Sequence, residues 1–411
     1  MSNPFKNRVF GCAIIKSINS NYNADFSHQP RTLPNGVVYA TDKALKYTVR
    51  NYWKDFYPDE KVFYFKSLNE KLKPRTLDER YEQLFEKFKT NITSDNFSVF
   101  EFDGEKVIGI LPSKPKPKDV KAPKDADSDN PLKTCEGTLK KIASKNIIEM
   151  KPEEVDITSF EVGENFYFFV NKNGNIEKIS DEESVFRKAI DIVLENMGGS
   201  VNRQETLKDL LSCLDIRVFG VTYAGKINIS IHGTCQITHG VNRFAENVIY
   251  TEQIMSPFRN PGENNTESTM TTLGTQSKLQ EGHYVHHFSV NPKNIADDAQ
   301  RVQSEGLLVE DIEKLKEALR KGASYYDSAA KAGTENELLL WVQLKEDSKA
   351  VLPSFVELVN INENREIDLQ KVSDLLAKDH IKSEIEKIEL YYNKGVTTII
   401  NAPEGAVEFE L

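Results

Sequence analysis

The chain has 411 residues, of which 39% are apolar and 28% charged, and its formal net charge is −10. This length provides a core for one large or two smaller domains, while the acidic total argues against a general nucleic-acid binder, since those are usually basic. The apolar runs are too short to span a bilayer, and residues 1–10 lack the pattern of a signal peptide. Four widely spaced cysteines without a C-x-x-C pair argue against a disulfide framework or zinc knuckle and suit a reducing cytoplasm.

Positive charge is concentrated at the start of the chain. Residues 1–54 carry eight Lys or Arg and two Asp, a net charge of +6, which leaves −16 for the remainder. A basic surface on an acidic body fits a protein that binds a polyanion on one side only. Chance clustering of solvated charges is an equally good explanation at the level of composition.

The first 54 residues predict a strand, a loop and a helix, in that order. Residues 8–17 form a short apolar run that ends in β-branched residues, as buried strands do. Residues 19–36 are rich in Asn, include two prolines and contain an Asn-Gly pair, so they predict a loop. Thr41 is suited to the N-cap of a helix over residues 42–54, whose first turn is favourable for Asp42.

The middle of the chain predicts two hairpins separated by a linker. Residues 97–110 flank an Asp-Gly turn, and residues 166–179 flank an Asn-Gly turn. Between them, residues 112–131 contain five prolines and five lysines, which is the composition of an exposed flexible linker. Apolar spacing within residues 184–196 predicts a helix.

The second half predicts a pair of strands and a long polar loop. Residues 214–223 and 226–236 predict the paired strands, and isoleucines alternate with polar residues in the second. Residues 256–282 are polar without a clear period, and a loop this long is usually functional or disordered. A strand, a helix and another strand follow at 284–290, 308–319 and 337–344. Because strands and helices mix without a regular βαβ period, the pattern favours the α+β class.

The helix predicted over residues 42–54 is amphipathic with an unusual polar face. Leu45, Val49, Tyr52 and Trp53 share one face, and four cations lie on the other at helical spacing: Lys43, Lys46, Arg50 and Lys54. Such a row of cations can follow successive phosphates of a nucleic acid. An ordinary solvated helix face is the alternative.

Five of the seven histidines lie between residues 232 and 287, yet their spacing matches no zinc motif. Adjacent His286 and His287 would point to opposite faces of a strand, and exposed strand histidines can stack on RNA or hydrogen-bond to it. A plain structural role is the alternative.

Signatures of nucleophilic enzymes, phosphate-binding loops and zinc proteases are missing. Asp25 could assist metal-dependent RNA cleavage, but a turn-forming role fits it better.

Several segments follow one another along the chain: NSNYNADFSHQPR with VVYATDKALKYTVRNYWKDF, then LDIRVFGVTYA, INISIHGTCQITHG and TMTTLGTQSKLQEGHYVHHF. In this order they resemble the CRISPR-associated Cas-seven (Cas7) family. Its members are the backbone subunits of type I interference complexes (Cascade), and the resemblance is nearest to the I-B branch. The resemblance covers about residues 7–60 and 205–345. This chain departs from the family pattern at Thr234, where proline is usual, in its Asn-rich loop, which lacks the usual Pro and Gly, and in a late loop that lacks the usual Arg-rich stretch.

The resemblance implies an α+β fold with an RRM-like (ferredoxin-like) palm, helical or inserted fingers and a protruding thumb. Residues 1–110 and 205–411 would form the palm, with the thumb at 256–282, and residues 111–204 would form a linker, a small insert and a helix. Copies would stack head to tail along one CRISPR RNA, beside other Cascade subunits, and leave the guide free to pair with target DNA. The resemblance implies no catalysis, cofactor, metal or membrane partner.

By position, the resemblance implies RNA contacts at thirteen residues. Phosphate contacts fall to Arg31, Lys43, Lys46 and Arg50; palm contacts to Arg217, Phe219, Gly220, His232 and Gln236; and thumb contacts to Met270, Thr271, Leu273 and Lys278. Core packing is the alternative for Phe219 and Leu273. Two other functions stay open: a type III-like subunit that cleaves RNA with Asp25, and a protein of the same fold that joins a complex without binding RNA.

Overall fold

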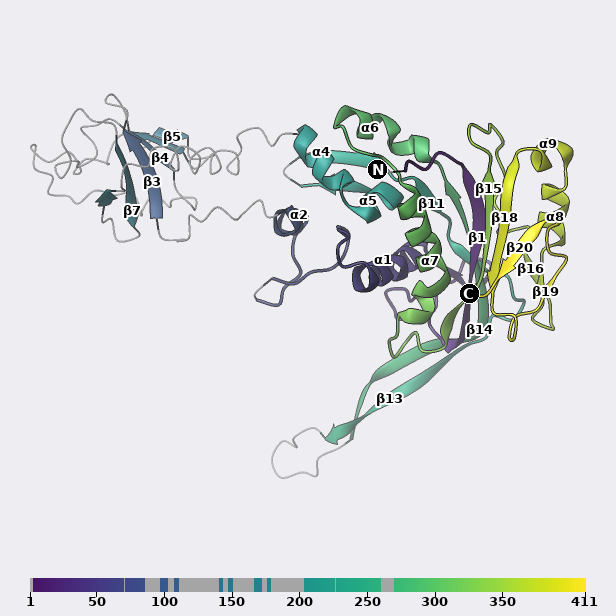
Figure 1. The fold of residues 1–411 in the computed structure, drawn as a ribbon. Helices are drawn as coiled ribbons and strands as arrows, with labels where there is room; N and C mark the ends of the chain where they lie inside the picture. Colours follow the sequence, from purple (N-terminus) through teal and green to yellow (C-terminus); the bar gives the residue numbers. More distant parts are fainter. Residues whose placement is uncertain are drawn as a thin grey trace, which may run out of the picture. The chain divides into compact units, whose positions relative to one another are not determined.

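A computed structural model describes residues 3–69, 71–85, 203–225, 227–259 and 270–411, together with six short strands between residues 97 and 178. Side-chain placement is described for the same residues outside 86–202 and 256–273. The chain divides into two compact units, residues 1–77 with 204–411 and residues 78–203. The first unit contains the large sheet and most of the helices (Figure 1).

A nine-stranded sheet forms the centre of the first unit. Its order is β2 (Tyr39–Ala40), β12 (Gly240–Asn242), β14 (Met270–Val290), β1 (Val9–Ser20), β15 (Thr334–Leu344), β18 (Ile385–Tyr392) and β20 (Ala406–Phe409). Two further strands, β11 (Cys235–Ile237) and β13 (Ile249–Arg259), also pair with β14. All neighbours are antiparallel except β18 and β20, so the sheet is mixed.

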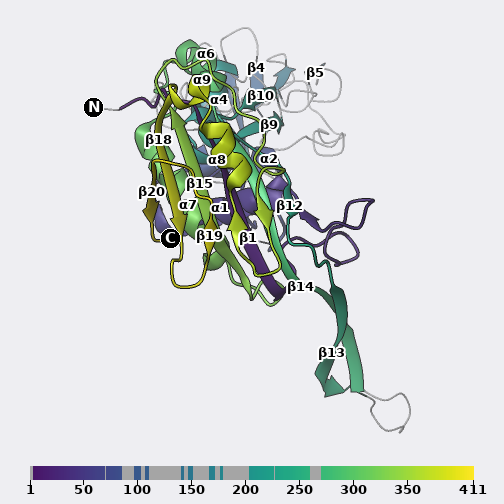
Figure 2. The ribbon, with the colours of Figure 1, turned by 90° about the vertical axis from the view of Figure 1, so that its right-hand side faces the viewer.

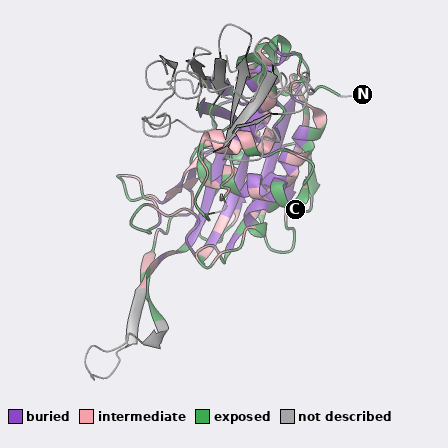
Figure 3. Ribbon diagram, turned by 90° about the vertical axis from the view of Figure 1, so that its left-hand side faces the viewer, coloured by how far each residue is buried: buried purple, intermediate pink, exposed green. Residues whose placement is uncertain are grey.

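Strand β1 is buried on both faces, which explains its nearly continuous apolar sequence. Cys12 and Ile14 face a core shared with the C-terminal segment, whose helices are α8 (Gln370–Leu376) and α9 (Asp379–Lys382). Figures 1 and 2 show these helices over one face of the sheet. Figure 3 shows that the strands of this sheet are mostly buried.

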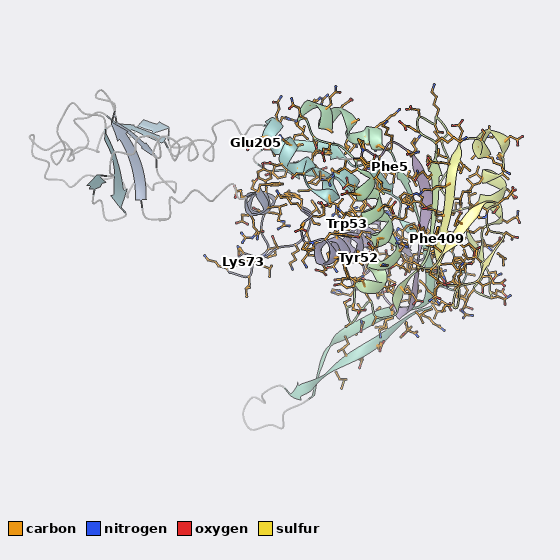
Figure 4. The ribbon with its side chains drawn as sticks, viewed as in Figure 1. Phe5, Tyr52, Trp53, Lys73, Glu205 and Phe409 are labelled. Atoms are coloured by element: carbon orange, nitrogen blue, oxygen red, sulfur yellow. The ribbon has the colours of Figure 1, made fainter. Side chains whose placement is uncertain are left out.

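Helices α1 (Asp42–Phe56) and α7 (Val309–Tyr325) pack together on the opposite face (Figure 1). Trp53 is buried between them, and its Nε1 donates to the Lys314 carbonyl at 3.0 Å. Gly322 permits close contact, because a Cβ there would lie 3.0 Å from the Thr48 carbonyl oxygen. Figure 4 labels Tyr52 and Trp53, which lie where α1 meets α7.

The remaining elements of the first unit are short. The helices are α4 (Arg203–Leu211), α5 (Leu214–Phe219), α6 (Ala296–Arg301) and the 3-10 turn η4 (Pro292–Ile295). Strands β9 (Gly220–Ala224) and β10 (Asn228–His232) form a hairpin, and β16 (Asn360–Ile361), β17 (Ile367–Asp368) and β19 (Ile399–Ile400) form a small sheet. Helix α2 (Leu77–Phe85) begins at the boundary between the units.

The second unit contains a sheet of order β5 (Lys140–Ile142), β6 (Ile147–Met150), β4 (Val107–Ile110), β3 (Phe97–Phe102), β7 (Phe166–Asn171) and β8 (Ile176–Lys178). Both hairpins predicted for the middle of the chain are confirmed as β3–β4 and β7–β8. The first was expected in the palm, but β3 pairs with β7 and belongs to the second unit. The linker at 112–131 and the helix at 184–196 lie outside the described residues.

Two predictions for the second half of the chain are wrong in part. Residues 214–219 form helix α5, and only 220–224 form a strand, because a short apolar run fits a buried helix as well as a strand. Residues 256–259 and 270–282 are strand rather than loop, since β13 and β14 continue as one long hairpin that projects beyond the sheet (Figures 1 and 2). Polar strands without a buried face carry no alternating signal, which explains the error.

The other strands and helices predicted for the ends of the chain are confirmed, with longer bounds. The strand at 8–17 is β1, the helix at 42–54 is α1, and 308–319 lies in α7. The strands at 284–290 and 337–344 lie in β14 and β15, and the alternation of β10 is as predicted. Among the described residues, no helix has the length and apolarity to cross a membrane.

Candidate nucleic-acid interface

The Asn-rich loop is fastened to the start of α1 by side-chain hydrogen bonds. Asn23 Oδ1 accepts from the Thr41 backbone N–H at 2.9 Å and from the Thr41 hydroxyl at 3.0 Å. Thr41 is the N-cap residue, as predicted, but its hydroxyl makes no capping bond to the helix. The Asp42 N–H donates to His239 Nδ1 at 3.3 Å, so the residue that precedes β12 also contacts this helix end.

Asp25 forms a tight turn within the same loop. Its Oδ1 accepts from the Ser27 N–H at 2.8 Å, the Ser27 hydroxyl at 2.7 Å and the Gln29 N–H at 3.0 Å. The hydrogen bond from the Ser27 side chain is the main reason that the pKa of Asp25 lies below its usual value. These bonds occupy one carboxylate oxygen, so Asp25 has the turn-forming role that its sequence context favours. The side chains described include no cluster of three metal-binding residues.

The row of cations on α1 is not continuous in the structure. The Lys43 side chain is 82% exposed, and Lys54 at the far end is 53% exposed. Lys46 is largely covered, with its ammonium 3.0 Å from Asp42 Oδ2. Arg50 is buried, and its Nε donates to the fully buried Asp215 at 2.9 Å. The predicted row of four cations is therefore interrupted at Arg50, which is the partner of a carboxylate from α5.

The lysines beside Asp42 outweigh the effect of its partial burial. Burial alone would raise the pKa of Asp42, but the hydrogen bond and charge of Lys46, together with the nearby Lys43, lower the pKa by more, so the net shift is downward. Asp42 therefore stays ionised in the first turn, where the helix dipole favours negative charge.

Arg31, from the preceding loop, is half-buried, and its Nε donates to the Ala24 carbonyl at 3.1 Å.

The three palm candidates around α5 have structural surroundings. Arg217 donates to both oxygens of buried Asp311, at 2.9 and 2.7 Å. Phe219 is buried and stacks on Trp53, with ring centroids 5.4 Å apart. Gly220 has φ +74°, and a Cβ there would lie 2.3 Å from the Ile231 carbonyl oxygen. These residues were expected on a palm strand, but the first two lie in α5, and Gly220 makes the turn into β9.

The remaining palm candidates are accessible. His232 is exposed at the end of β10, and Gln236 is exposed in β11, where its Nε2 donates to the Gly233 carbonyl at 2.8 Å. Among the thumb candidates, Lys278 lies in β14 and pairs with Glu252 of β13 at 2.6 Å. The backbone of Met270, Thr271 and Leu273 belongs to β14, and their side chains lie outside the described placements.

The histidines of β14 are buried, so the expectation of exposed strand histidines is wrong for them. His283, His286 and His287 are at most 8% exposed. His286 Nδ1 lies 3.0 Å from the Thr238 carbonyl oxygen, and Tyr22 hydroxyl lies 3.3 Å from its Nε2. Burial lowers the pKa of both His286 and His287 to about 4. The two adjacent histidines point to opposite faces of the strand, as predicted, since His286 packs against Tyr22 and His287 packs against Phe355.

Sequence reasoning missed exposed aromatic residues on α1, in the segment after it and in the Asn-rich loop. Phe26 is 99% exposed in the Asp25 turn, and Tyr47 and Tyr64 are 38% and 52% exposed. The amphipathic pattern of α1 could have indicated Tyr47, which lies on the same face as Lys43 and Lys54. Exposed aromatic rings beside lysines are typical of single-strand nucleic-acid surfaces. The described side chains thus place cations and aromatic rings on one accessible side of α1.

Comparison with known proteins shows a similar fold and identifies the family. The fold resembles a chain of a solved "CRISPR RNA-guided surveillance complex, pre-nicking", with a TM-score of 0.51, 13% identity, and 98% and 96% of the two chains covered. A chain of a second "CRISPR RNA-guided surveillance complex" matches with a TM-score of 0.29 and 13% identity over 48% of this chain and 77% of that chain. The family model of CRISPR-associated protein Cas7 matches residues 7–378. The chain belongs to the Cas7 family. No curated protein matches it.

Proposed function

We propose that this chain is a non-catalytic, cytoplasmic backbone subunit that binds CRISPR RNA in a surveillance complex. The observation that carries the proposal is the Cas7 family match, which runs from β1 through the interface region and beyond β15. Cations and aromatic rings beside α1 suit recognition of a sugar-phosphate backbone, which must be independent of guide sequence. The acidic total charge does not oppose this function, because the positive charge is concentrated in the first 54 residues.

The finer features of the proposal follow the family resemblance. The large sheet would be an RRM-like palm, and the β13–β14 hairpin would be the thumb, with Met270, Thr271 or Leu273 as the wedge between bases. Copies would assemble head to tail, since contacts of that kind that do not close generate filaments. The complex would be a type I, I-B-like Cascade with further subunits, and its guide would pair with target DNA.

Lys43, Lys46 and Arg31 remain the best candidates for phosphate contacts. Lys43 is the most accessible of them, and Lys46 lies one turn away, next to Asp42. Arg50 and Arg217 are better assigned to positioning α1 and α5, because each pairs with a buried carboxylate. His232 and Gln236 remain candidates on exposed strand positions.

Reversal of charge at Lys43 tests the proposal. We expect Lys43→Glu to weaken binding of unrelated RNA sequences alike and to reduce the slope of log K against log salt by about 0.7, the value for one phosphate on a single strand. Lys382→Glu is the matched control, since Lys382 is 56% exposed and lies on the opposite face of the sheet. Filter binding at several salt concentrations measures both effects. Equal loss in the two variants, or loss with only some sequences, would contradict the assignment.

Two measurements separate the alternatives. A subunit of the same fold that does not bind RNA would purify without nucleic acid, whereas we expect small RNA and a large assembly by absorbance ratio and size. A type III-like enzyme would cut complementary RNA periodically in magnesium, and Asp25→Ala would abolish the cuts. We expect no such cuts, because Asp25 is engaged in its own turn.

A further inference from the structure

A short segment after α1 presents aromatic rings from a fixed backbone. The Phe63 and Tyr64 N–H groups donate to the two oxygens of Asp215, at 2.8 and 2.9 Å. Asp215 is fully buried and is also the partner of Arg50. A buried carboxylate with three charge-assisted or backbone hydrogen bonds is a rigid anchor. The segment is therefore held against α1, although it has no regular secondary structure.

Three aromatic residues lie on α1 and on this anchored segment, and we call Tyr47, Tyr64 and Phe65 the aromatic shelf. Tyr47 and Phe65 are stacked, with centroids 5.4 Å apart and planes 17° apart. Tyr64 is backed by the guanidinium of Arg50, 5.5 Å from its ring centroid. The Lys54 ammonium lies 5.2 Å from the Phe65 centroid. Each ring of the shelf thus packs against a neighbouring ring or cation, and Lys54 lies over the face of Phe65.

Two of the three rings of the shelf remain exposed despite these contacts, and Phe65 is half-buried. Tyr64 is 52% exposed and Tyr47 is 38% exposed, whereas Trp53 on the inner side of α1 is fully buried. Lys43 and Lys54 flank Tyr47 along the same face of the helix. Each lysine has one carboxylate neighbour in its own helix, but exposed pairs of this kind are weak and can be exchanged for phosphate.

The combination specifies the chemistry of an occupant. Flat rings favour planar, apolar faces, and the neighbouring ammonium groups favour anions. A single-stranded nucleic acid offers both, because its bases stack and its phosphates are negative. An acidic peptide supplies the charge without a regular series of planar groups.

We propose that the aromatic shelf is a stacking site for an unpaired nucleobase, with Lys54 and Lys43 binding the phosphates on either side. The site rests on the proposed function and extends it, since it continues along α1 from the phosphate-binding end. Base stacking is tolerant of sequence, so the shelf would serve any guide. In this arrangement Arg50 is a positioning residue, because it acts through Tyr64 and Asp215 rather than on RNA.

Substitution of Tyr64 tests the shelf, because its side chain can be removed without losing the backbone bond to Asp215. The probe is a single-stranded RNA that carries 2-aminopurine, mixed with the full chain. We expect Tyr64→Ala to bind about 5- to 100-fold more weakly, as loss of one stacked base predicts, with the salt slope unchanged. Tyr64→Phe, which keeps the ring, should bind like the unsubstituted chain. Stacking should quench the 2-aminopurine fluorescence only where the ring is present.

The controls distinguish failure of the stacking site from failure of the proposed RNA-binding function. Normal RNA binding and quenching by Tyr64→Ala, while Lys43→Glu binds weakly, would overturn the shelf and leave the proposed function standing. Normal binding by both variants would overturn both. Loss of assembly size with normal RNA binding would make the shelf a protein contact and overturn the stacking site. A parallel series with single-stranded DNA of the same sequence distinguishes the guide from a displaced DNA strand as the source of the base.

Discussion

Two positions on one helix show how differently cations at the same spacing can be used. Lys43, in the first turn of α1, projects into solvent, whereas Arg50, two turns later, is buried against Asp215. Their angular separation around the helix is small, so periodicity places both on one face. The difference comes from α5, whose buried Asp215 pairs with Arg50 and has no counterpart at Lys43. Exposure, not spacing, therefore separates a candidate contact to RNA from a structural ion pair.

Removal of Arg50 should have the largest effect and would sharpen this comparison. We expect Arg50→Leu to lower the free energy of unfolding by about 3–5 kcal/mol, because it leaves the buried Asp215 charge without its partner. Lys43→Leu, an equal change on the exposed end of the same helix, should leave the urea midpoint nearly unchanged. Urea unfolding followed by tryptophan fluorescence measures both. Similar midpoints for the two variants would break the distinction between the two positions.

Acidification should have a somewhat smaller effect, through the buried histidines of β14. The pKa of His286 is lowered to about 4 by burial, so the unfolded chain binds its proton first as the pH falls. Stability is therefore lost between pH 6.5 and 4, by about 3 kcal/mol for a shift of this size, and changes no further below pH 4. The groups around His286 are Tyr22, Asp42 and His239.

Substitution separates His286 from the carboxylates that titrate in the same range. His286→Gln should reduce the dependence of the urea midpoint between pH 6.5 and 5, where most carboxylates remain ionised, and the remaining slope should come from His287. The exposed His232→Gln is the matched control and should retain the slope. An unchanged slope in His286→Gln would show that this histidine does not carry the pH dependence.

A change at Gly220 should have the smallest of the three effects and tests the turn between α5 and β9. Gly220→Ala should cost about 1–3 kcal/mol, because φ is +74° and the added Cβ meets the Ile231 carbonyl oxygen. Gly405→Ala is a useful comparison, since its φ is +79° but no atom lies within 4 Å of an added Cβ. A greater loss of thermal stability at Gly220 than at Gly405 is expected, and the opposite order would argue against the steric account.

Local pattern predicted much of the secondary structure, and its two failures have different causes. The alternation of Ile229 and Ile231 with polar residues located β10, and the apolar face of α1 located the helix. The run at 214–223 failed because the packing of α5 buries Asp215 with the apolar residues around it. The hairpin of β13 and β14 failed because its polar strands pair with each other instead of covering a core.

The sequence alone determined the order of the family segments and the concentration of positive charge before residue 55. Only the tertiary structure decided which cations and histidines face solvent, because their partners are distant in the chain. Asp215 is 165 residues from Arg50, and Asp311 is 94 residues from Arg217. Burial by such distant partners leaves no periodic signal around the buried residue. The role of Arg50 was therefore set by Asp215 of α5, not by the spacing within the helix.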